Sequence, residues 1–237
     1  MVKLSVNINK IATLRNARGG NNPDLLSMAR DIQIYGADGI TIHPRPDERH
    51  ITYNDAICLP KVINKEFNIE GNPIDKFISL VSKIKPDQVT LVPDSIDAVT
   101  SNAGWDTIKN KNFLKEVISE FKKNGIRTSI FVDPELKFIE GAKETGTDRI
   151  ELYTESYATN FEKGNLGEIN KYIKASSLAN KLGMKINAGH DLNLQNINYF
   201  VSKLPFLDEV SIGHAIFCES LYLGIENVIN LYLQKIK

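Results

Sequence analysis

The chain has 237 residues, with 29 lysines or arginines and 29 aspartates or glutamates, so its formal net charge at pH 7 is zero. Without an excess of basic residues it has no electrostatic field to hold a nucleic-acid backbone, and we expect no nucleic-acid partner. Hydrophobic residues make up 42% and charged residues 24%, an ordinary globular composition, and the length fits a single α/β barrel.

The N-terminal segment MVKLSVNINK has too short an apolar run for a signal peptide or a membrane span. The two cysteines, Cys58 and Cys218, cannot build a disulfide framework and lack the paired spacing of a structural zinc site. We therefore expect two buried, small side chains in a reduced, cytoplasmic protein with no membrane partner.

A repeating unit organises the chain: a short β-type run, a polar loop and a stretch with helical spacing. The predicted strands are Leu4–Ile8, Gly39–Ile42, Phe67–Glu70, Gln88–Val92, Thr128–Val132, Arg149–Leu152, Lys185–Ala188 and Glu209–Ile212. Eight units without a linker between them predict one (β/α)8 TIM-barrel domain over residues 1–237. An open α/β sheet is the alternative, but neither GxGxxG nor GxxxxGK[ST] follows the first strand.

Helical spacing marks several of the connections between these strands. The predicted helices begin at Pro23, at Pro73, near Phe113 and at Pro134, cover Asp55–Asn64 with an interruption at Pro60, and finish with one over Leu221–Ile236. A proline favours a helix start because its missing N–H would have no partner there. Asn124-Gly125 and Gly146 are expected to end two of the helices.

Polar side chains follow the predicted strands, at the face of a barrel that carries the active site. In chain order they are Asn7, Asn9, Lys10, Arg15 and Arg18; His43, Arg45 and His50; Glu70; Thr100; Asp133; Glu151 and Tyr153; Asn187 and His190; and Gly213 and His214. All four histidines of the chain belong to this set. This clustering favours an active site over scattered structural histidines.

Some of these residues also have structural explanations. Glu70 could cap the next helix or pair with an arginine, and Glu151 could be a barrel-core carboxylate paired with an arginine. Arg18 and Arg45 could be solvated loop charges or bidentate anion ligands. The residues alone leave both interpretations of the arginines open.

Two places in the sequence suit an anion. Gly213 directly follows the last strand and opens a helix, so it offers backbone N–H groups at the positive end of that helix. Arg45 with His50 suggests a second anion subsite on the opposite side of the barrel mouth. Two such subsites predict either a bisphosphate or two phosphorylated substrates.

The reaction class is narrowed by elimination. Lys10 is the one candidate for a Schiff base, because Lys185 begins its strand and faces the other end of the barrel. A zinc site would have to be assembled from separate strands, since no HExxH or HxH pair occurs. Acid–base catalysis by imidazoles and carboxylates remains, which suits condensation, dehydration and elimination on a carbonyl compound. A metal-dependent sugar-phosphate isomerase or epimerase and a non-catalytic phosphosugar-binding barrel stay open as alternatives.

Over essentially its whole length the sequence resembles the pyridoxine 5′-phosphate synthase family. The strings that carry the resemblance are VNINKIATLRNARG at 6–19, GADGITIH at 36–43, RHIT at 49–52, NAGH at 187–190 and IGHA at 212–215. The resemblance implies a (β/α)8 barrel that condenses 1-deoxy-D-xylulose 5-phosphate with 3-amino-2-oxopropyl phosphate. The products would be pyridoxine 5′-phosphate, inorganic phosphate and water, formed by an octamer without a metal or organic cofactor.

The resemblance also implies residue roles. It implies proton acceptors at His43 and Glu70, a proton donor at His190 and a transition-state stabiliser at Glu151. The remaining residues would bind substrate: the aminoketone phosphate and product phosphate at Asn7, Arg18, Asp191, Gly213 and His214, and the deoxyxylulose phosphate at Asn9, Lys10, Arg45, His50 and Thr100. The loop Pro93–Asp106 would be a lid that excludes water.

Two positions depart from the family pattern. Many members have Asp-His where this chain has Asn9-Lys10, and a lysine can supply a charge there but cannot shuttle a proton as imidazole does. A glycine is common where this chain has Asp191, which tolerates unusual backbone angles but adds a negative charge. We expect activity to persist with altered substrate affinity.

Overall fold

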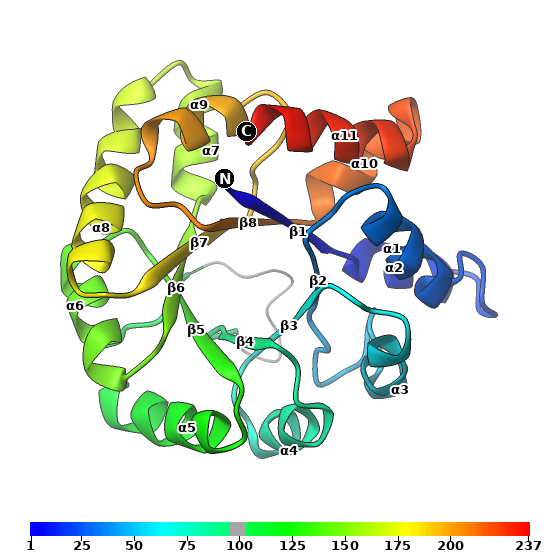
Figure 1. Cartoon of the computed structure of the whole chain (residues 1–237), viewed down its shortest axis with the longest axis horizontal. Coiled ribbons are helices and arrows are strands. Elements are labelled where there is room, and N and C mark those ends of the chain that lie inside the picture. The colour runs from blue at the N-terminus through cyan, green and yellow to red at the C-terminus, as the bar shows by residue number, and fades with distance from the viewer. Residues whose placement is uncertain (95–102) are drawn as a thin grey trace.

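The predicted strands form a closed parallel barrel, β1 to β8 in chain order, in a computed structural model that describes residues 1–94 and 103–237 (Figure 1). The strands are β1 (Lys3–Asn7), β2 (Gly39–Ile42), β3 (Glu66–Gly71), β4 (Gln88–Leu91), β5 (Arg127–Val132), β6 (Arg149–Tyr153), β7 (Lys185–Gly189) and β8 (Glu209–Ile212). The (β/α)8 prediction is confirmed, and no predicted strand end is displaced by more than one residue.

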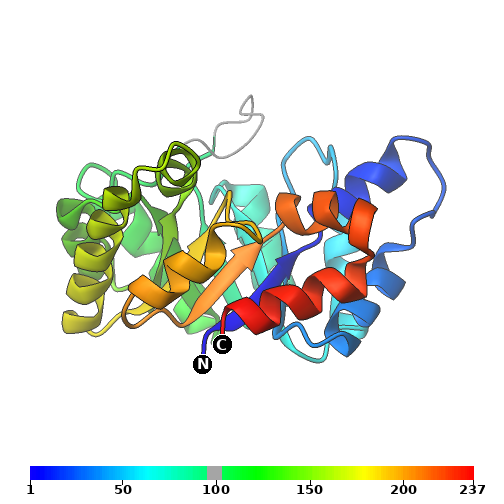
Figure 2. The same ribbon diagram turned by 90° about the horizontal axis from the view of Figure 1, so that it is seen from above.

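Helices surround the barrel on its outside (Figure 1). They are α1 (Asn9–Asn16), α2 (Leu25–Ile34), α3 (Tyr53–Cys58), η1 (Leu59–Lys61), α4 (Asp75–Ile84), α5 (Lys111–Lys123), α6 (Leu136–Thr145), α7 (Glu155–Glu162), η2 (Leu166–Glu168), α8 (Ile169–Lys181), α9 (Ile197–Lys203), α10 (His214–Leu223) and α11 (Ile225–Lys235). Figure 2 shows both chain termini side by side at the end of the barrel where β1 begins. The carboxyl ends of the strands form the opposite end, where predicted site residues such as His43, Glu70 and Glu151 lie.

The interior of the barrel is polar. Ser5 Oγ lies 2.7 Å from Thr41 Oγ1, Asn68 Nδ2 donates to Thr41 Oγ1 at 3.3 Å, and Thr90 Oγ1 donates to Asn68 Oδ1 at 3.1 Å. Alternate residues of a strand point to opposite faces, so the apolar neighbours of these side chains face the helices. The hydrophobic core therefore lies between barrel and helices and includes the fully buried Leu4, Val6, Ile40, Ile42, Ile69, Val89 and Ile150.

A polar cluster around Arg149 lies inside the barrel, toward the end where the strands begin. Arg149 Nη1 donates to Asn187 Oδ1 at 3.0 Å and lies 3.5 Å from Glu209 Oε2 and 4.0 Å from Glu66 Oε1. Arg149 and Glu151 both point inward from β6 but lie in different layers of the barrel, as residues i and i+2 of a strand do. The interpretation that Glu151 pairs with an arginine is therefore wrong for the residues that the structure describes.

Helix boundaries agree with the prediction where capping residues set them. Asp24 caps α2 and accepts a hydrogen bond from the Ser27 backbone N–H at 2.6 Å, and α5 and α6 stop before Asn124 and Gly146 as expected. α4 begins two residues after Pro73, at Asp75.

Three helical predictions needed correction. The segment expected to be helical over Asp55–Asn64 is α3 followed by the short η1, which contains Pro60. The expected helix Leu221–Ile236 is divided between α10 and α11 at Gly224, whose positive φ of 80° interrupts the helical backbone. The segment after β1, expected to be a polar loop, forms α1.

Neither cysteine is fully buried, contrary to expectation. Cys58 is half-buried at the end of α3, and Cys218 is exposed on α10, one turn after His214. Cys218 lies on the outer face of its helix because Ile216 supplies the buried contact. Both thiols are free.

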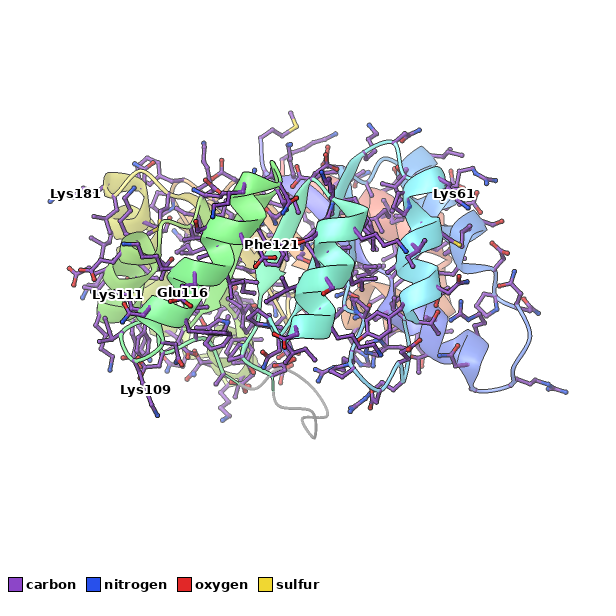
Figure 3. All side chains as sticks on the ribbon, turned by 90° about the horizontal axis from the view of Figure 1, so that it is seen from below. Lys61, Lys109, Lys111, Glu116, Phe121 and Lys181 are labelled. Atoms are coloured by element: carbon purple, nitrogen blue, oxygen red, sulfur yellow. The ribbon has the colours of Figure 1, made fainter. Side chains whose placement is uncertain are left out.

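The outer helix surfaces carry the charge of the molecule. Figure 3 labels three residues of α5: Lys111 and Glu116 lie at the surface, whereas Phe121 is fully buried. Lys111 pairs with Glu144 of α6 at 2.7 Å. Among the helices of residues 1–94 and 103–237, none is long and apolar enough to span a membrane.

Candidate active site

Asn7 and Asn9 connect two of the predicted catalytic residues. Asn7 ends β1, and its Nδ2 donates to Glu70 Oε2 of β3 at 3.4 Å. Asn7 Oδ1 accepts from the Asn9 backbone N–H at 3.1 Å, and Asn9 Oδ1 accepts from the His43 backbone N–H at 2.9 Å. These contacts fix His43 at the end of β2 relative to Glu70 at the end of β3.

Glu70 and Glu151 form a buried carboxylate pair. The pKa of Glu70 is raised to about 8, chiefly by burial and also by the negative charges of Asp94 and Glu209, against the opposing effects of Arg45 and Asn7. Burial also raises the pKa of Glu151 well above its usual value, and the charge of Glu70 adds to this. Among the described residues, Glu70 neither caps a helix nor forms an ion pair. The interpretations of Glu70 as a helix cap or as the partner of an arginine are therefore wrong for that part of the chain.

Glu151 has an unusual environment. Its Oε2 is buried and has no hydrogen-bond partner among the residues with described positions. Its Oε1 lies so close to Gly189 of β7 that a Cβ at that glycine would be 2.3 Å away. The raised pKa favours the protonated form of Glu151, and a protonated carboxyl group can donate a hydrogen bond from this buried position.

His43 is a neutral imidazole at the bottom of the site. Burial lowers its pKa well below the usual value, and the positive charges of Arg45, His50 and Arg49 act in the same direction. Its Nε2 lies 4.0 Å from Asp94 Oδ2. A neutral imidazole can accept a proton, which matches the role that the resemblance implied.

Arg45 is a buried residue and not a solvated loop charge. Its Nη2 donates to Asp94 Oδ2 at 2.7 Å, and the two side chains are 6% and 3% exposed. Arg45 and His43 line one small pocket together with Tyr53, Asn72, Phe77 and Asp94. Burial excludes the interpretation of Arg45 as a solvated loop charge, and its role as an anion ligand stays a prediction.

His50 lies beside this pocket, its ring centroid 6.4 Å from that of His43. Burial lowers the pKa of His50 to about 4, and Arg45, Arg49 and Lys10 contribute. Its Nδ1 accepts a hydrogen bond from the Ile51 backbone N–H at 2.9 Å, so in the neutral ring Nε2 carries the proton. His50 is therefore a neutral hydrogen-bond donor beside Arg45.

His190 and Asp191 form the turn after β7. Their φ angles are 78° and 57°, so two consecutive non-glycine residues adopt the left-handed conformation. Thr154 Oγ1 donates to the carbonyl oxygens of Gly189, at 2.8 Å, and of His190, and Asn196 Nδ2 donates to Asp191 O at 3.1 Å. The expectation that Asp191 tolerates an unusual backbone angle is confirmed.

Asp191 and Tyr153 both contact the His190 imidazole. Its Nδ1 lies 2.8 Å from Asp191 Oδ2, and its ring stands edge-on to Tyr153, with ring centroids 5.1 Å apart. The hydrogen bond with His190 lowers the pKa of Asp191, and burial opposes this effect. A charged Asp191 beside the ring can stabilise a protonated His190, the form that donates a proton.

Gly213 and His214 begin α10 next to β1. A Cβ at Gly213 would lie 3.1 Å from both the Cβ and the carbonyl oxygen of Asn7, so a side chain there would require Asn7 to shift by a few tenths of an ångström. The His214 side chain is exposed on the first turn of α10, near enough to Asp191 for its charge to lower the pKa of that carboxyl. Asn7 therefore joins the Glu70 side of the site to the α10 side.

One predicted site residue, Arg18, lies apart from this arrangement, and another, Thr100, is outside the described residues. Arg18 is exposed beyond the end of α1, and its side chain forms no hydrogen bond or ion pair with residues 1–94 or 103–237. Thr100, and with it residues 95–102 of the expected lid Pro93–Asp106, lies outside the described residues. Of the remaining lid residues, Gly104 N–H donates to Asp133 Oδ2 at 3.0 Å, and Trp105 N–H donates to Phe131 O at 2.8 Å.

Asp94 and Asn72 belong to the site but were not predicted. Asp94 follows β4 and binds Arg45, and Asn72 follows β3 and donates from Nδ2 to the Asp94 carbonyl oxygen at 2.8 Å. Both obey the strand-end rule that selected the other residues, so that rule could have found them. Within residues 1–94 and 103–237, no group of three or more His, Cys, Asp or Glu side chains is arranged to hold a metal ion.

Comparison with known proteins identifies close relatives. The chain is 67% identical to the pyridoxine 5′-phosphate synthase of Flavobacterium johnsoniae and 63% identical to that of Cytophaga hutchinsonii, over all of each chain. Among solved structures, it resembles 3-keto-L-gulonate-6-phosphate decarboxylase from Vibrio cholerae, with a TM-score of 0.66 and 9% identity over 99% of this chain and 97% of that one. The last similarity concerns the fold alone.

The family model described as pyridoxal phosphate biosynthesis protein PdxJ matches residues 4–237. That match covers every strand and helix of the barrel except Lys3, the first residue of β1. Together with the identity to the two relatives, it shows that the chain belongs to the PdxJ family of pyridoxal phosphate biosynthesis proteins.

Proposed function

We propose that the chain is a pyridoxine 5′-phosphate synthase of vitamin B6 biosynthesis. It would condense 1-deoxy-D-xylulose 5-phosphate with 3-amino-2-oxopropyl phosphate to pyridoxine 5′-phosphate, inorganic phosphate and water. The observation that carries this proposal is 67% identity over the full length to a protein of that name. The buried Glu70 and Glu151 pair beside a neutral His43 supports acid–base chemistry at the same barrel end.

His43 and Glu70 are the proposed proton acceptors. Ring formation from two carbonyl compounds requires removal of protons from carbon and nitrogen, and an acceptor must be unprotonated before each transfer. His43 meets this condition at neutral pH because its pKa is lowered by burial and nearby arginines. Glu70, with a pKa of about 8, holds a transferred proton well once it has accepted one.

Glu151 and His190 are the proposed acid partners. A neutral Glu151 can donate its O–H to negative charge that develops on a substrate oxygen in the barrel interior. A protonated His190, stabilised by Asp191, can give its proton to a leaving hydroxyl or phosphate. Asp191 would thus support His190 in this chain, where the family commonly has a glycine.

Two phosphate subsites are proposed. Lys10, Arg45 and His50, with Asn9 and Thr100, would bind deoxyxylulose phosphate. The aminoketone phosphate and then the product phosphate would lie at the start of α10, on the following residues: Asn7, Arg18, Asp191, Gly213 and His214. The bare backbone at Gly213 and the positive end of α10 favour an anion there.

Two alternatives give different experimental results. We propose that the reaction needs neither metal nor organic cofactor, so chelator treatment should leave the activity intact. A metal-dependent isomerase or epimerase would instead hold stoichiometric metal and lose activity on chelation. A non-catalytic phosphosugar-binding barrel would form no product, and His43→Ala would change nothing but affinity. Elemental analysis of the purified protein and an assay of that variant distinguish the three.

The pH dependence of the reaction follows from Glu70. Below a pH of about 8 the free enzyme holds Glu70 protonated and unable to accept a proton, so kcat/KM should rise as pH increases toward that value. His43, with its lowered pKa, should not limit the rate in this range. Initial rates measured from pH 6 to 9 check this, and an acid limb near the ordinary glutamate pKa would contradict it.

Arg45→Ala should raise the KM for deoxyxylulose phosphate far more than it lowers kcat, because a phosphate ligand remote from the reacting atoms mainly supplies binding. A rise of about 10- to 100-fold is expected for loss of a charge-assisted hydrogen bond. Arg49→Ala is the matched control, since Arg49 pairs with Asp47 on the exposed side of the same loop. Equal losses in kcat and in affinity would assign Arg45 to the chemical step instead.

We also propose a homo-oligomer, an octamer, in the cytoplasm. At the end of α10, Leu221 is 80% and Tyr222 89% exposed, and Leu223 follows at 47%. Consecutive large apolar side chains at a surface are typical of protein contacts. Light scattering should give a mass of about eight chains, and Leu221→Glu should lower it, whereas Phe206→Glu, which changes another exposed apolar residue, should not.

A further inference from the structure

Asp94 contacts the proposed phosphate ligand Arg45 but has no assigned role in the proposed reaction. Asp94 Oδ2 accepts from Arg45 Nη2 at 2.7 Å, and its side chain is almost completely buried. Asn72 Nδ2 donates to the Asp94 backbone carbonyl at 2.8 Å and holds the residue in place. The guanidinium is thus already bound to an anion that belongs to the protein.

The Asp94 carboxylate also lies close to the proposed base. The same Oδ2 is 4.0 Å from His43 Nε2, and Asp94, Arg45 and His43 all line one small pocket. An anion that approached the Arg45 fork from this pocket would meet the position that the carboxylate occupies.

We propose that Asp94 is the resident counter-ion of Arg45 and that the phosphate group of the bound substrate displaces its carboxylate from the guanidinium. This inference rests on the proposed function, in which Arg45 binds the phosphate of deoxyxylulose phosphate. It adds that binding there is an exchange of one anion for another.

The exchange has a physical reason. A buried guanidinium without a counter-ion would cost several kcal/mol, so an empty site needs an internal carboxylate. A phosphate dianion presents more charge and more acceptor oxygens to the planar guanidinium than a carboxylate does, and can replace it. A sugar without phosphate cannot, so Asp94 would also make Arg45 selective for a phosphorylated substrate.

Charged and titratable groups from several elements face Asp94. Arg45 and His43 follow β2, and the Asp94 charge also acts on Glu70 at the end of β3 and on Tyr153 at the end of β6. Removing the Asp94 charge should favour the ionised form of Glu70. The acid limb of kcat/KM should then move to lower pH in Asp94→Asn, in addition to the change in affinity.

Calorimetric titration tests the exchange directly. Inorganic phosphate and deoxyxylulose 5-phosphate are titrated separately into wild type, Asp94→Asn and Asp47→Asn at pH 7.5. Asp94→Asn should bind both ligands about fivefold or more tightly, because an internal competitor is removed. Asp47→Asn is the matched control from the exposed Asp47–Arg49 pair and should match wild type. Unchanged or weaker binding by folded Asp94→Asn would overturn the proposal.

A wild-type measurement covers the case in which Asp94→Asn does not fold. In crystals of the wild-type protein with deoxyxylulose 5-phosphate, Arg45 should contact the phosphate, and the distance from Arg45 Nη2 to Asp94 Oδ2 should exceed about 4 Å. A retained contact, with the phosphate bound elsewhere, would overturn the exchange. Product formation by wild type is measured in parallel, so an inactive protein that still shows the exchange would count against the proposed function alone.

Discussion

Replacing Glu70 with glutamine should lower kcat/KM by about 10²- to 10⁴-fold, the usual effect of removing a general base. Glutamine keeps the size of the side chain and can still accept the hydrogen bond from Asn7, so the loss would report on proton transfer. Steady-state assays with both phosphorylated substrates measure it. A loss smaller than about tenfold would exclude Glu70 as a proton acceptor.

The same substitution should make the protein more stable. Burial raises the pKa of Glu70 to about 8, so between its ordinary value and pH 8 the folded chain binds more protons than the unfolded chain, and stability falls as pH rises. Above pH 8 the folded protein carries the whole cost of a buried ionised carboxylate, on the order of 2 kcal/mol or more. Glu70→Gln removes that cost, so thermal unfolding at pH 9 should occur at a higher temperature than in wild type.

Glu116→Gln is the control for both effects of Glu70→Gln. Glu116 lies on the exposed face of α5 (Figure 3), far from any strand end in the chain. Its replacement should change neither kcat/KM nor the unfolding temperature at pH 9. If Glu70→Gln is as unstable as wild type at pH 9, Glu70 does not have the raised pKa on which its proposed role depends.

Arg15→Met should destabilise the fold by about 3–5 kcal/mol, the cost of leaving one partner of a buried ion pair alone. Arg15 is 8% exposed and binds Asp55 through two bonds, Nη1 to Oδ1 at 2.7 Å and Nη2 to Oδ2 at 2.8 Å. Burial raises the pKa of Asp55, but Arg15 and the capping contact with Thr52 outweigh this and lower it. Methionine would leave that charge buried without a cation. Urea denaturation at pH 7 measures the loss.

Two variants control for this effect. Lys111→Met breaks the exposed pair with Glu144 and should cost less than about 1 kcal/mol. The double replacement of Arg15 and Asp55 by apolar residues should be less destabilising than Arg15→Met, since no charge is then left unpaired. A loss below about 1 kcal/mol for Arg15→Met itself would contradict the buried-pair explanation.

The fold could be predicted because alternating local signals repeat along the chain. Short β-type runs recur and set all the strands, whereas helix ends were predicted only where Asp24, Gly146 or Asn124 supplied a capping signal. α1 was missed because Asn9, Lys10 and Thr13 give it a polar appearance. Leu221 was expected in the apolar pattern of the last helix but is 80% exposed, because helical spacing alone does not show whether a neighbouring element covers a side chain.

The site could be predicted as a list of residues but not as a set of contacts. Strand-end position selected His43, Glu70, Glu151 and His190 correctly as one barrel face. It could not show that Arg149 binds Glu209, 60 residues away, and leaves Glu151 without an arginine. The neutral state of His50 could not be predicted from the sequence either, because burial and neighbouring cations set its pKa.

An assay with both substrates tests the proposed synthase activity of the chain. Purified, chelator-treated wild-type protein is mixed with 1-deoxy-D-xylulose 5-phosphate and 3-amino-2-oxopropyl phosphate, and pyridoxine 5′-phosphate and inorganic phosphate are measured over time. We predict that both appear together in equal amounts, at a rate that rises from pH 6 to 8. Correctly folded protein that forms neither product from these two substrates would contradict the account.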